Sequence, residues 1–292
     1  MRKGFLFLFI VCTVTVSLAQ PYVDVLNVRT IQSPDQGLIR RNNHKNSFEY
    51  FNASLTLPIR FKKTGGALIF SPYVENWQVH LPDINKQASL VTERDQFFPT
   101  GIGLPLTVLT PIPRSKFLLN TTMILRSNAE QLNLPGSFQA GGFVVMNYKI
   151  NPKLTLKAGL YYNREAFGNF FMPIAGLEYK IDSTLQMWGA LPGSFFLEKK
   201  LKKRWYAGLT FKAVNNSYQL FNGRYIQFND NQLSLFSDFY FTKNLVLNLE
   251  AGHSLFRRIR IGKSGSIRQY MYEEKVNDNL LFRVSAIYRI RL

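Results

Sequence analysis

Hydrophobic and polar side chains alternate with a period of two residues along most of this 292-residue chain. The pattern is clearest in residues 280–292, where nearly every second side chain is apolar and Arg283, Arg289 and Arg291 stand between them. A β-strand points successive side chains to opposite faces, so this segment predicts a strand between an apolar and a polar environment. Because the apolar face runs to the last residue, we expect this strand to close a barrel in lipid.

A strand over residues 22–31 opens the series. The same alternation is repeated in residues 51–61, 156–162, 175–181, 207–213, 233–241 and 245–251. Such alternation over about ten residues is typical of strands with one apolar and one polar face. Aromatic residues near the strand ends predict interfacial girdles: Phe51, Phe61, Tyr162, Phe171, Trp205, Phe241 and Phe282.

The connections between these segments alternate in length. Short turns fall at residues 62–66, 111–116, 151–154, 182–184, 200–204 and 242–244. Longer polar connections fall at residues 32–47, 81–96, 128–139, 215–231 and 257–279, and residues 190–193 are a short connection where a long one is due. This pattern favours an all-β, antiparallel, up-and-down transmembrane barrel with short periplasmic turns and longer external loops. We count about fourteen strands, or twelve if residues 185–200 form one irregular excursion.

Four prolines interrupt the predicted strands: Pro58, Pro72, Pro105 and Pro173. A proline removes a ladder hydrogen bond, and a closed barrel has no edge where that loss is harmless. Rims or bulges are the positions where we expect them.

The first residues have the form of a secretory signal. Arg2 and Lys3 precede an apolar stretch, residues 5–16, and Ser17-Leu18-Ala19 is a small-x-small cleavage site. We therefore divide the chain into a signal peptide, residues 1–19, and a single barrel domain, residues 20–292, exported to the bacterial outer membrane. Cys12 is the one cysteine, so the mature chain has neither disulfides nor a cysteine zinc site. No apolar run is long enough for a spanning helix.

The charge balance is strongly basic. Of the 36 Lys and Arg residues, Arg2 and Lys3 lie in the signal, which leaves 34 against 18 acidic residues. An exported chain meets little nucleic acid, so we predict outer-membrane lipid, anionic glycolipid and anionic small solutes as partners. Nine of the basic residues cluster at the short turns, where they can contact lipid phosphates: Lys62, Lys63, Arg114, Lys116, Lys199, Lys200, Lys202, Lys203 and Arg204.

Two further sets of charged residues are candidate sites. Charges on the polar faces of strands would line the lumen, where they either pair with one another or make a mildly anion-selective pore. These are Lys157, Glu178, Lys212, Asp238, Glu250, Arg283 and Arg289. The last long connection would form an external basic loop, either solvated or bound to anionic glycolipid, with Arg257, Arg258, Arg260, Lys263 and Arg268.

Catalytic chemistry has little support in the sequence. His44, His80 and His253 lie in separate segments without metal-ligand spacing, and His253 and Ser254 point to opposite faces of one strand. Gly262-Lys263-Ser264 lacks the upstream glycine of a phosphate-binding loop. We therefore predict no enzyme activity, no metal and no cofactor.

Two segments carry a resemblance to a known family. Residues 159–164 with 170–181, and residues 190–198, resemble a family of uncharacterised bacterial outer-membrane barrel domains. The final strand is similar to the insertion signal of such barrels, with Leu292 in place of phenylalanine, which implies the barrel-insertion machinery as a partner. The family has no assigned activity, so the resemblance implies fold and compartment only. The function we expect is a passive pore or small-solute transport, with a non-conducting surface-binding or structural scaffold as the alternative.

Overall fold

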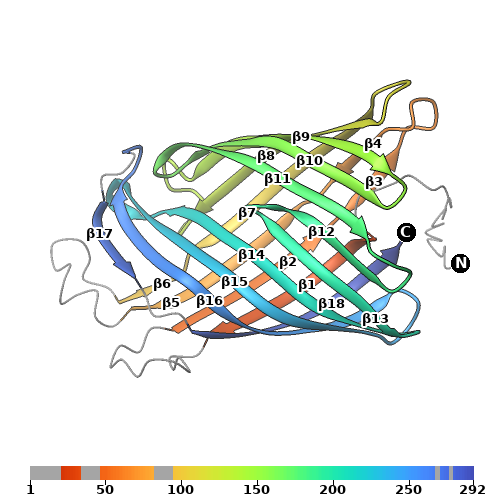
Figure 1. Ribbon diagram of the computed structural model, residues 1–292. Coiled ribbons are helices and arrows are strands. Elements are labelled where there is room, and N and C mark those ends of the chain that lie inside the picture. Colours follow the sequence, from red (N-terminus) through yellow and green to blue (C-terminus); the bar gives the residue numbers. More distant parts are fainter. Residues whose placement is uncertain (1–20, 34–46, 82–94, 267–269, 276–278) are drawn as a thin grey trace, which may run out of the picture.

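The computed structural model describes residues 21–33, 47–81, 95–266, 270–275 and 279–292. Within these ranges the strands form one sheet that closes on itself as an antiparallel barrel (Figure 1). Four pairs of strands are interrupted halves of one wall strand: β2 with β3, β4 with β5, β6 with β7, and β17 with β18. The wall therefore has 14 strands, which confirms the predicted fold class and strand number. The predicted signal peptide lies outside the described residues.

The first half of the barrel contains β1 (Tyr22–Ser33), β2 (Ser47–Leu55), β3 (Leu57–Arg60), β4 (Ala67–Phe70), β5 (Tyr73–His80), β6 (Gln96–Phe97), β7 (Thr100–Pro111), β8 (Phe117–Ala129) and β9 (Phe138–Asn151). The second half contains β10 (Leu154–Glu165), β11 (Gly168–Lys180), β12 (Leu185–Leu191), β13 (Ser194–Lys202), β14 (Trp205–Gln219), β15 (Arg224–Tyr240), β16 (Leu245–Lys263), β17 (Tyr270–Lys275) and β18 (Leu280–Arg291). A short 3-10 turn, Phe221–Gly223, joins β14 to β15. No helix in the described ranges is both long and apolar enough to cross a membrane.

The barrel closes where the first strand meets the last. β1 pairs with β18 in antiparallel register from Tyr22 opposite Arg291 to Gln32 opposite Phe282. β18 pairs on its other side with β16, and the backbone N–H of Leu292 donates to Pro21 O at 2.9 Å. The prediction that residues 280–292 close the barrel is therefore confirmed.

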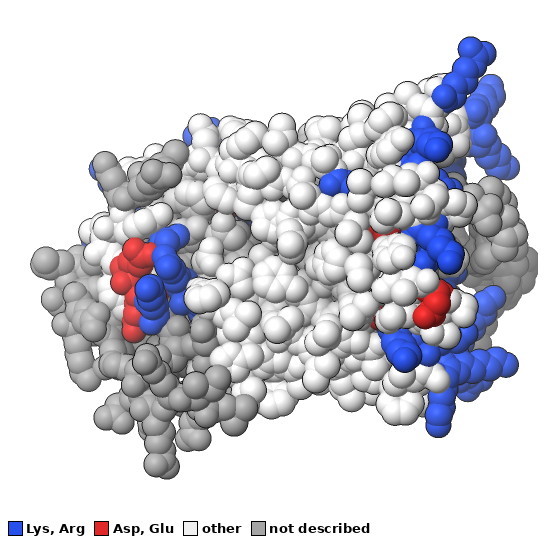
Figure 2. All heavy atoms as spheres, in the orientation of Figure 1, with Lys and Arg blue, Asp and Glu red and all other residues white. Residues whose placement is uncertain are grey.

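The two faces of the wall differ as the alternation predicts. Outward side chains such as Leu160, Leu235 and Phe282 are 52%, 65% and 49% exposed, and the aromatic residues predicted at the girdles all lie on this exposed surface. A continuous apolar belt of this kind is stable in hydrocarbon and not in water. Figure 2 shows the belt free of charged side chains over most of the visible wall, with lysine and arginine gathered at the end of the barrel that carries the short turns.

The short turns are built from residues that bind their own backbone. In the turn from β11 to β12, the Asp182 carboxylate accepts hydrogen bonds from the backbone N–H groups of Thr184 and Leu185 and from the Thr184 hydroxyl. The Thr184 N–H bond is the main reason that the pKa of Asp182 lies below its usual value.

Two predicted loops are wrong. Residues 215–231 and 257–279 were expected to be long connections, but β14 and β15 pair as far as Gln219 and Tyr225, and β16 continues to Lys263 and pairs with β17. These segments also alternate, but their apolar side chains, such as Ile226 and Ile259, are buried inside the barrel. The other face is polar, and Asn215 and Gln227 on it bond to each other at 2.7 Å across the two strands. The polar outward face makes these segments resemble connections. The short connection at residues 190–193 is confirmed.

Three of the four prolines lie at interruptions or unpaired stretches of the ladder, whereas Pro58 lies within β3, opposite Ile69 of β4. Pro72 lies at the break between β4 and β5, and Pro105 lies opposite this break, where its carbonyl accepts from Ser71 N at 2.9 Å. Pro173 lies in the part of β11 that has no neighbour on the β12 side, because the β11–β12 pairing begins at Ala175. A proline is tolerated at such a position because its missing N–H faces no partner strand.

The register of closure can be tested by crosslinking. Val28 and Ala286 face each other across β1 and β18. Opposed residues of antiparallel strands have Cα atoms about 4.5–5.5 Å apart, within disulfide range. We expect the Val28→Cys, Ala286→Cys protein to form an intramolecular disulfide in folded barrels, visible as an altered mobility on gels without reductant.

The matched control moves one cysteine along the strand. Val28→Cys with Phe282→Cys places the thiols four residues out of register, roughly 13 Å apart, and is expected to remain reduced. Equal crosslinking of both pairs would contradict the described closure.

Candidate functional site

The lumen contains a charged cluster at mid-height, formed by Lys212, Glu250, Arg283 and Gln232. Lys212 Nζ lies 2.7 Å from Glu250 Oε1, Arg283 Nη1 bonds to Glu250 Oε2, and Arg283 Nη2 donates to Gln232 Oε1 at 2.6 Å. These residues come from β14, β15, β16 and β18, and the strand register brings them to one level. Charges on the lipid face cost about 2–4 kcal/mol at mid-bilayer, so their inward direction follows from the membrane itself.

A second group fills the lumen towards the end with the short turns. Arg289 bonds at 2.5 Å to both Asp238 and Asp24, and Arg291 pairs with Glu198 at 2.8 Å. The Arg291 guanidinium also stacks 3.5 Å from the centre of the Tyr206 ring. On the opposite wall, Lys157 and Glu178 form a 2.6 Å ion pair between β10 and β11.

The structure thus places every predicted lumen residue inside the barrel, in three separate groups. Lys212, Glu250 and Arg283 meet, as do Asp238 with Arg289 and Lys157 with Glu178. Sequence reasoning missed several lumen residues that share these surroundings: Asp24, Arg29, Glu198 and Arg291. Parity within the strand would have identified Arg29, Glu198 and Arg291, whereas the irregularity between Asp24 and Leu26 shifts Asp24 out of the parity of Arg29.

The prediction of an external basic loop is wrong, because most of its basic residues lie in a strand. Arg257, Arg258, Arg260 and Lys263 belong to strand β16, and Arg268 lies outside the described residues. Arg257 is buried and pairs with Asp230 at 3.0 Å, while Arg258 and Arg260 pair with Glu273 of β17 at 3.5 and 2.9 Å. Binding of glycolipid by this region stays a prediction.

The end of the lumen opposite the short turns is filled by apolar and aromatic side chains, which we call the roof cluster. Its members are Ile31, Phe48, Tyr50, Trp77, Val79, Leu81, Phe97, Tyr218, Leu220, Ile226, Phe228, Ile259, Ile261, Tyr272 and Leu281. Tyr218 anchors it, because its hydroxyl donates to Glu75 Oε1 at 2.6 Å and accepts from Trp77 Nε1 at 2.8 Å. The cluster packs across the barrel at this level.

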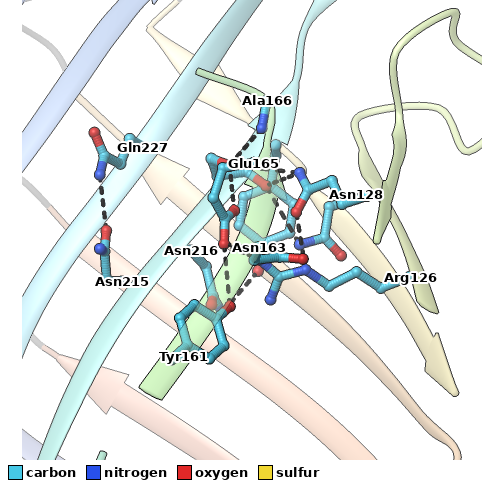
Figure 3. A network of polar contacts seen from close by, with 12 residues as sticks. Arg126, Asn128, Tyr161, Asn163, Glu165, Ala166, Asn215, Asn216 and Gln227 are labelled. Carbon is cyan, nitrogen blue, oxygen red and sulfur yellow. Dashed lines mark hydrogen bonds and ion pairs between the residues drawn. The ribbon is translucent and has the colours of Figure 1, made fainter. Parts of the chain in front are cut away.

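A polar network holds the end of β14, residues 215–219, against the strands on the far side (Figure 3). Glu165 is its centre: it receives Arg126 Nη2 at 2.5 Å, Ser217 Oγ at 2.7 Å and Asn163 Nδ2 at 2.8 Å. Gln139 Nε2 donates to the Ser217 carbonyl at 3.0 Å. The end of β14 is therefore tied to β8, β9 and β10 as well as to the roof cluster.

Below the roof lies a cavity of about 1330 Å³ with two unlike walls. Apolar side chains line it on β8, β9 and β11, among them Leu118, Ile124, Phe143, Val145, Met172 and Ile174. Asn120 and Asn147 lie among them, and Lys157 and Tyr161 line the intervening β10. Arg29, Lys212 and Arg283 line the opposite side, on β1, β14 and β18. Within the described residues Arg29 has no salt bridge to a carboxylate, and its Nε has no hydrogen-bond partner, although its guanidinium lies near Tyr50, 5.8 Å from the ring centre, and is attracted by Glu75 and Glu250. This guanidinium is the group best placed to meet an anionic solute.

The described residues contain no group of three or more His, Cys, Asp or Glu side chains that could hold a metal ion. His253 bonds through Nδ1 to the carbonyl of its neighbour Ser254 at 2.7 Å.

The fold and its charged lumen define the class: this is a β-barrel of the outer-membrane type. The structure is similar to the COG4313 outer membrane channel from Pseudomonas putida F1, with 8% sequence identity and a TM-score of 0.50 over 95% of this chain and 100% of that one. The KdgM and NanC porins also match, with 8% and 6% identity, TM-scores of 0.35 and 0.38, and coverage of 90% and 91% of this chain and 98% and 100% of theirs.

Within that class, the chain belongs to the family described as Domain of unknown function (DUF6268), which matches residues 40–292. The resemblance to an uncharacterised outer-membrane barrel family is thus confirmed. No curated protein matches the chain.

The polar network around Glu165 predicts a large loss of stability when its charge is removed. The side chains of Arg126 and Glu165 are 8% and 2% exposed, and breaking such a buried pair costs about 3–5 kcal/mol. We expect Glu165→Gln to lower the free energy of unfolding by about this amount in denaturant titrations of the barrel in detergent micelles.

The matched control is the same substitution in an exposed pair. Glu273 is 39% exposed and pairs with both Arg258 and Arg260, so solvent screens its charge and Glu273→Gln should cost about 0–1 kcal/mol. Similar losses for the two variants would show that Glu165 does not hold the end of β14.

Proposed function

We propose that this protein is an outer-membrane barrel for passive transport of small solutes, with a preference for anions. The observation that carries the proposal is the cavity of about 1330 Å³, lined by a guanidinium, that of Arg29, without a carboxylate partner in the described part of the chain. Five basic and two acidic side chains line this space. A cavity above the usual range of about 300–1,000 Å³ for ligand pockets can hold a small solute with water around it.

The roof cluster limits the transport that we propose. It fills the centre of the lumen at the end opposite the short turns. Three of its members, Ile31, Tyr50 and Trp77, also line the cavity. The cavity lining also includes Asn229, Asn231 and Arg260 on the outward side of β15 and β16, so a solute can pass beside the roof rather than through it. We therefore expect small currents compared with those of an open porin.

A non-conducting scaffold is the second candidate, and the packing of the roof favours it. Tyr218, Ile226, Ile259 and Leu281 are fully buried there, which suits a permanently filled end. In that case the external part of β16 would act as a contact for outer-membrane lipid or anionic glycolipid. A reconstituted barrel that never conducts and never passes solute would favour the scaffold.

Ion selectivity tests the pore. Under a potassium chloride gradient in planar bilayers, the reversal potential of the wild-type protein should lie towards the equilibrium potential of chloride, because Arg29 places positive charge inside the cavity. Arg29→Gln should move this reversal potential towards zero without abolishing current.

The control is Lys63→Gln, which removes one positive charge from an exposed turn that projects beyond the barrel (Figure 1). This variant should keep the wild-type reversal potential. Cation preference in the wild type, or an equal shift in both variants, would rule out the lumen as the source of selectivity.

A further inference from the structure

The wall of the barrel has a step between β11 and β14. β12 and β13 have only seven and nine residues, and they end at the turn around Pro192 and Gly193. β11 pairs with β12 only from Ala175 onward, and β14 pairs with β13 only up to Lys212. Beyond the turn, β11 and β14 continue without a strand between them (Figure 1).

On the side away from the short turns, the step is bounded by other parts of the chain. It is therefore a window in the wall, enclosed on all sides, rather than a notch open at one end. The turn from β10 to β11 docks onto the end of β14, where Ala166 N donates to Ser217 Oγ at 3.0 Å. Gly265 N donates to Ala166 O at 2.9 Å, and the rings of Phe167 and Tyr225 lie 5.9 Å apart. The polar network around Glu165 therefore also supports the upper frame of the window.

The cavity reaches this window. Its lining includes Met172 and Ile174 on the β11 side, Gly193 and Ser194 at the lower edge, and Val214 on the β14 side. It also includes Phe171, an outward residue of β11 that is 62% exposed. A single space thus contacts both the lumen and the outer surface of the wall.

The window lies at the boundary between the hydrocarbon and the polar surface. Along the outward face of β14, apolar Leu209, Phe211 and Ala213 give way to Asn215, and on β15 Leu233 gives way to Asn231. Unpaired strand edges are costly in hydrocarbon but are tolerated where water or polar groups reach them. This depth suits a molecule that has both an apolar and a polar end.

We propose that the window is a lateral portal through which a single-chain amphipathic anion passes between the outer leaflet and the cavity. The apolar side chains of β8, β9 and β11, among them Phe143, Met172 and Ile174, contact the chain, and Arg29 with Lys212 and Arg283 binds the anionic head. The inference rests on the proposed transport function and specifies its substrate class and route.

The test uses tryptophan fluorescence and a brominated fatty acid, which quenches on contact. The chain has three tryptophans: Trp77 and Trp188 line the cavity, whereas Trp205 is exposed on the outer surface. In Trp205→Phe protein reconstituted into vesicles, 12-bromododecanoate should quench the remaining emission, with a fast phase as the probe enters the cavity through the window. Vesicles made with a brominated two-chain phosphatidylcholine measure the background, which is the quenching of the lumen tryptophans by bromine atoms that remain in the bilayer outside the barrel wall.

Blocking the window separates the lateral route from other routes. Ser194→Phe with Val214→Phe adds bulk to residues that line the cavity at the window, and should abolish the fast phase of quenching. Leu191→Phe with Ala207→Phe adds aromatic rings to β12 and β14 at positions outside the cavity lining, and should leave the fast phase unchanged. Unchanged fast quenching in the blocked variant, or no quenching above background in the parent, would overturn the portal.

The head group is tested with Arg29→Gln. A hydrogen bond to a charged group contributes about 1.5–3 kcal/mol, so the apparent affinity for 12-bromododecanoate should fall roughly tenfold or more. Affinity for uncharged 12-bromododecanol should not change, and an equal loss for both probes would overturn the anionic specificity. If chloride currents persist while the portal fails, the proposed transport function stands; loss of both removes the two together.

Discussion

The requirement that every backbone hydrogen bond be satisfied inside hydrocarbon shapes this molecule. A strand in lipid has no water to bond to, so the sheet must close, and the pairing of β1 with β18 achieves this. Closure in turn fixes which side chains face lipid and which face the lumen. The step at β12 and β13 is where the wall departs from this rule, and it lies at a depth where polar groups can reach the free edges.

The size of the barrel explains why its interior is only partly filled. Barrels of about eight strands are filled by their own side chains, whereas those of about sixteen leave an aqueous channel. With 14 strands this barrel lies between the two. Its roof cluster packs one end, ion pairs around Arg289 occupy much of the other, and the charged cluster around Glu250 lies at mid-height beside the remaining cavity.

The sequence predicts the wall well, because each residue of a strand such as 280–292 faces either lipid or lumen, and the period of two records that difference. It fails where the alternation continues beyond the lipid. There the apolar side chains, such as Ile226 and Ile259, belong to the roof cluster inside the barrel. Polar side chains such as Gln227 and Arg260 occupy the other face, so these segments resemble polar connections. Arg29 shares its parity with other lumen residues, but its lack of a carboxylate partner depends on strand register, which a sequence does not give.

The arrangement of lipid outside and a polar lumen inside can be measured directly along β18. Spin labels placed one at a time on cysteines at positions 282 to 288 report accessibility to oxygen, which dissolves in hydrocarbon, and to a water-soluble nickel complex. We predict that labels at Phe282, Val284, Ala286 and Tyr288 are oxygen-accessible in vesicles, while those at Arg283, Ser285 and Ile287 are not. Equal accessibility at alternate positions, or access of the nickel complex to the outward ones, would contradict the barrel described here.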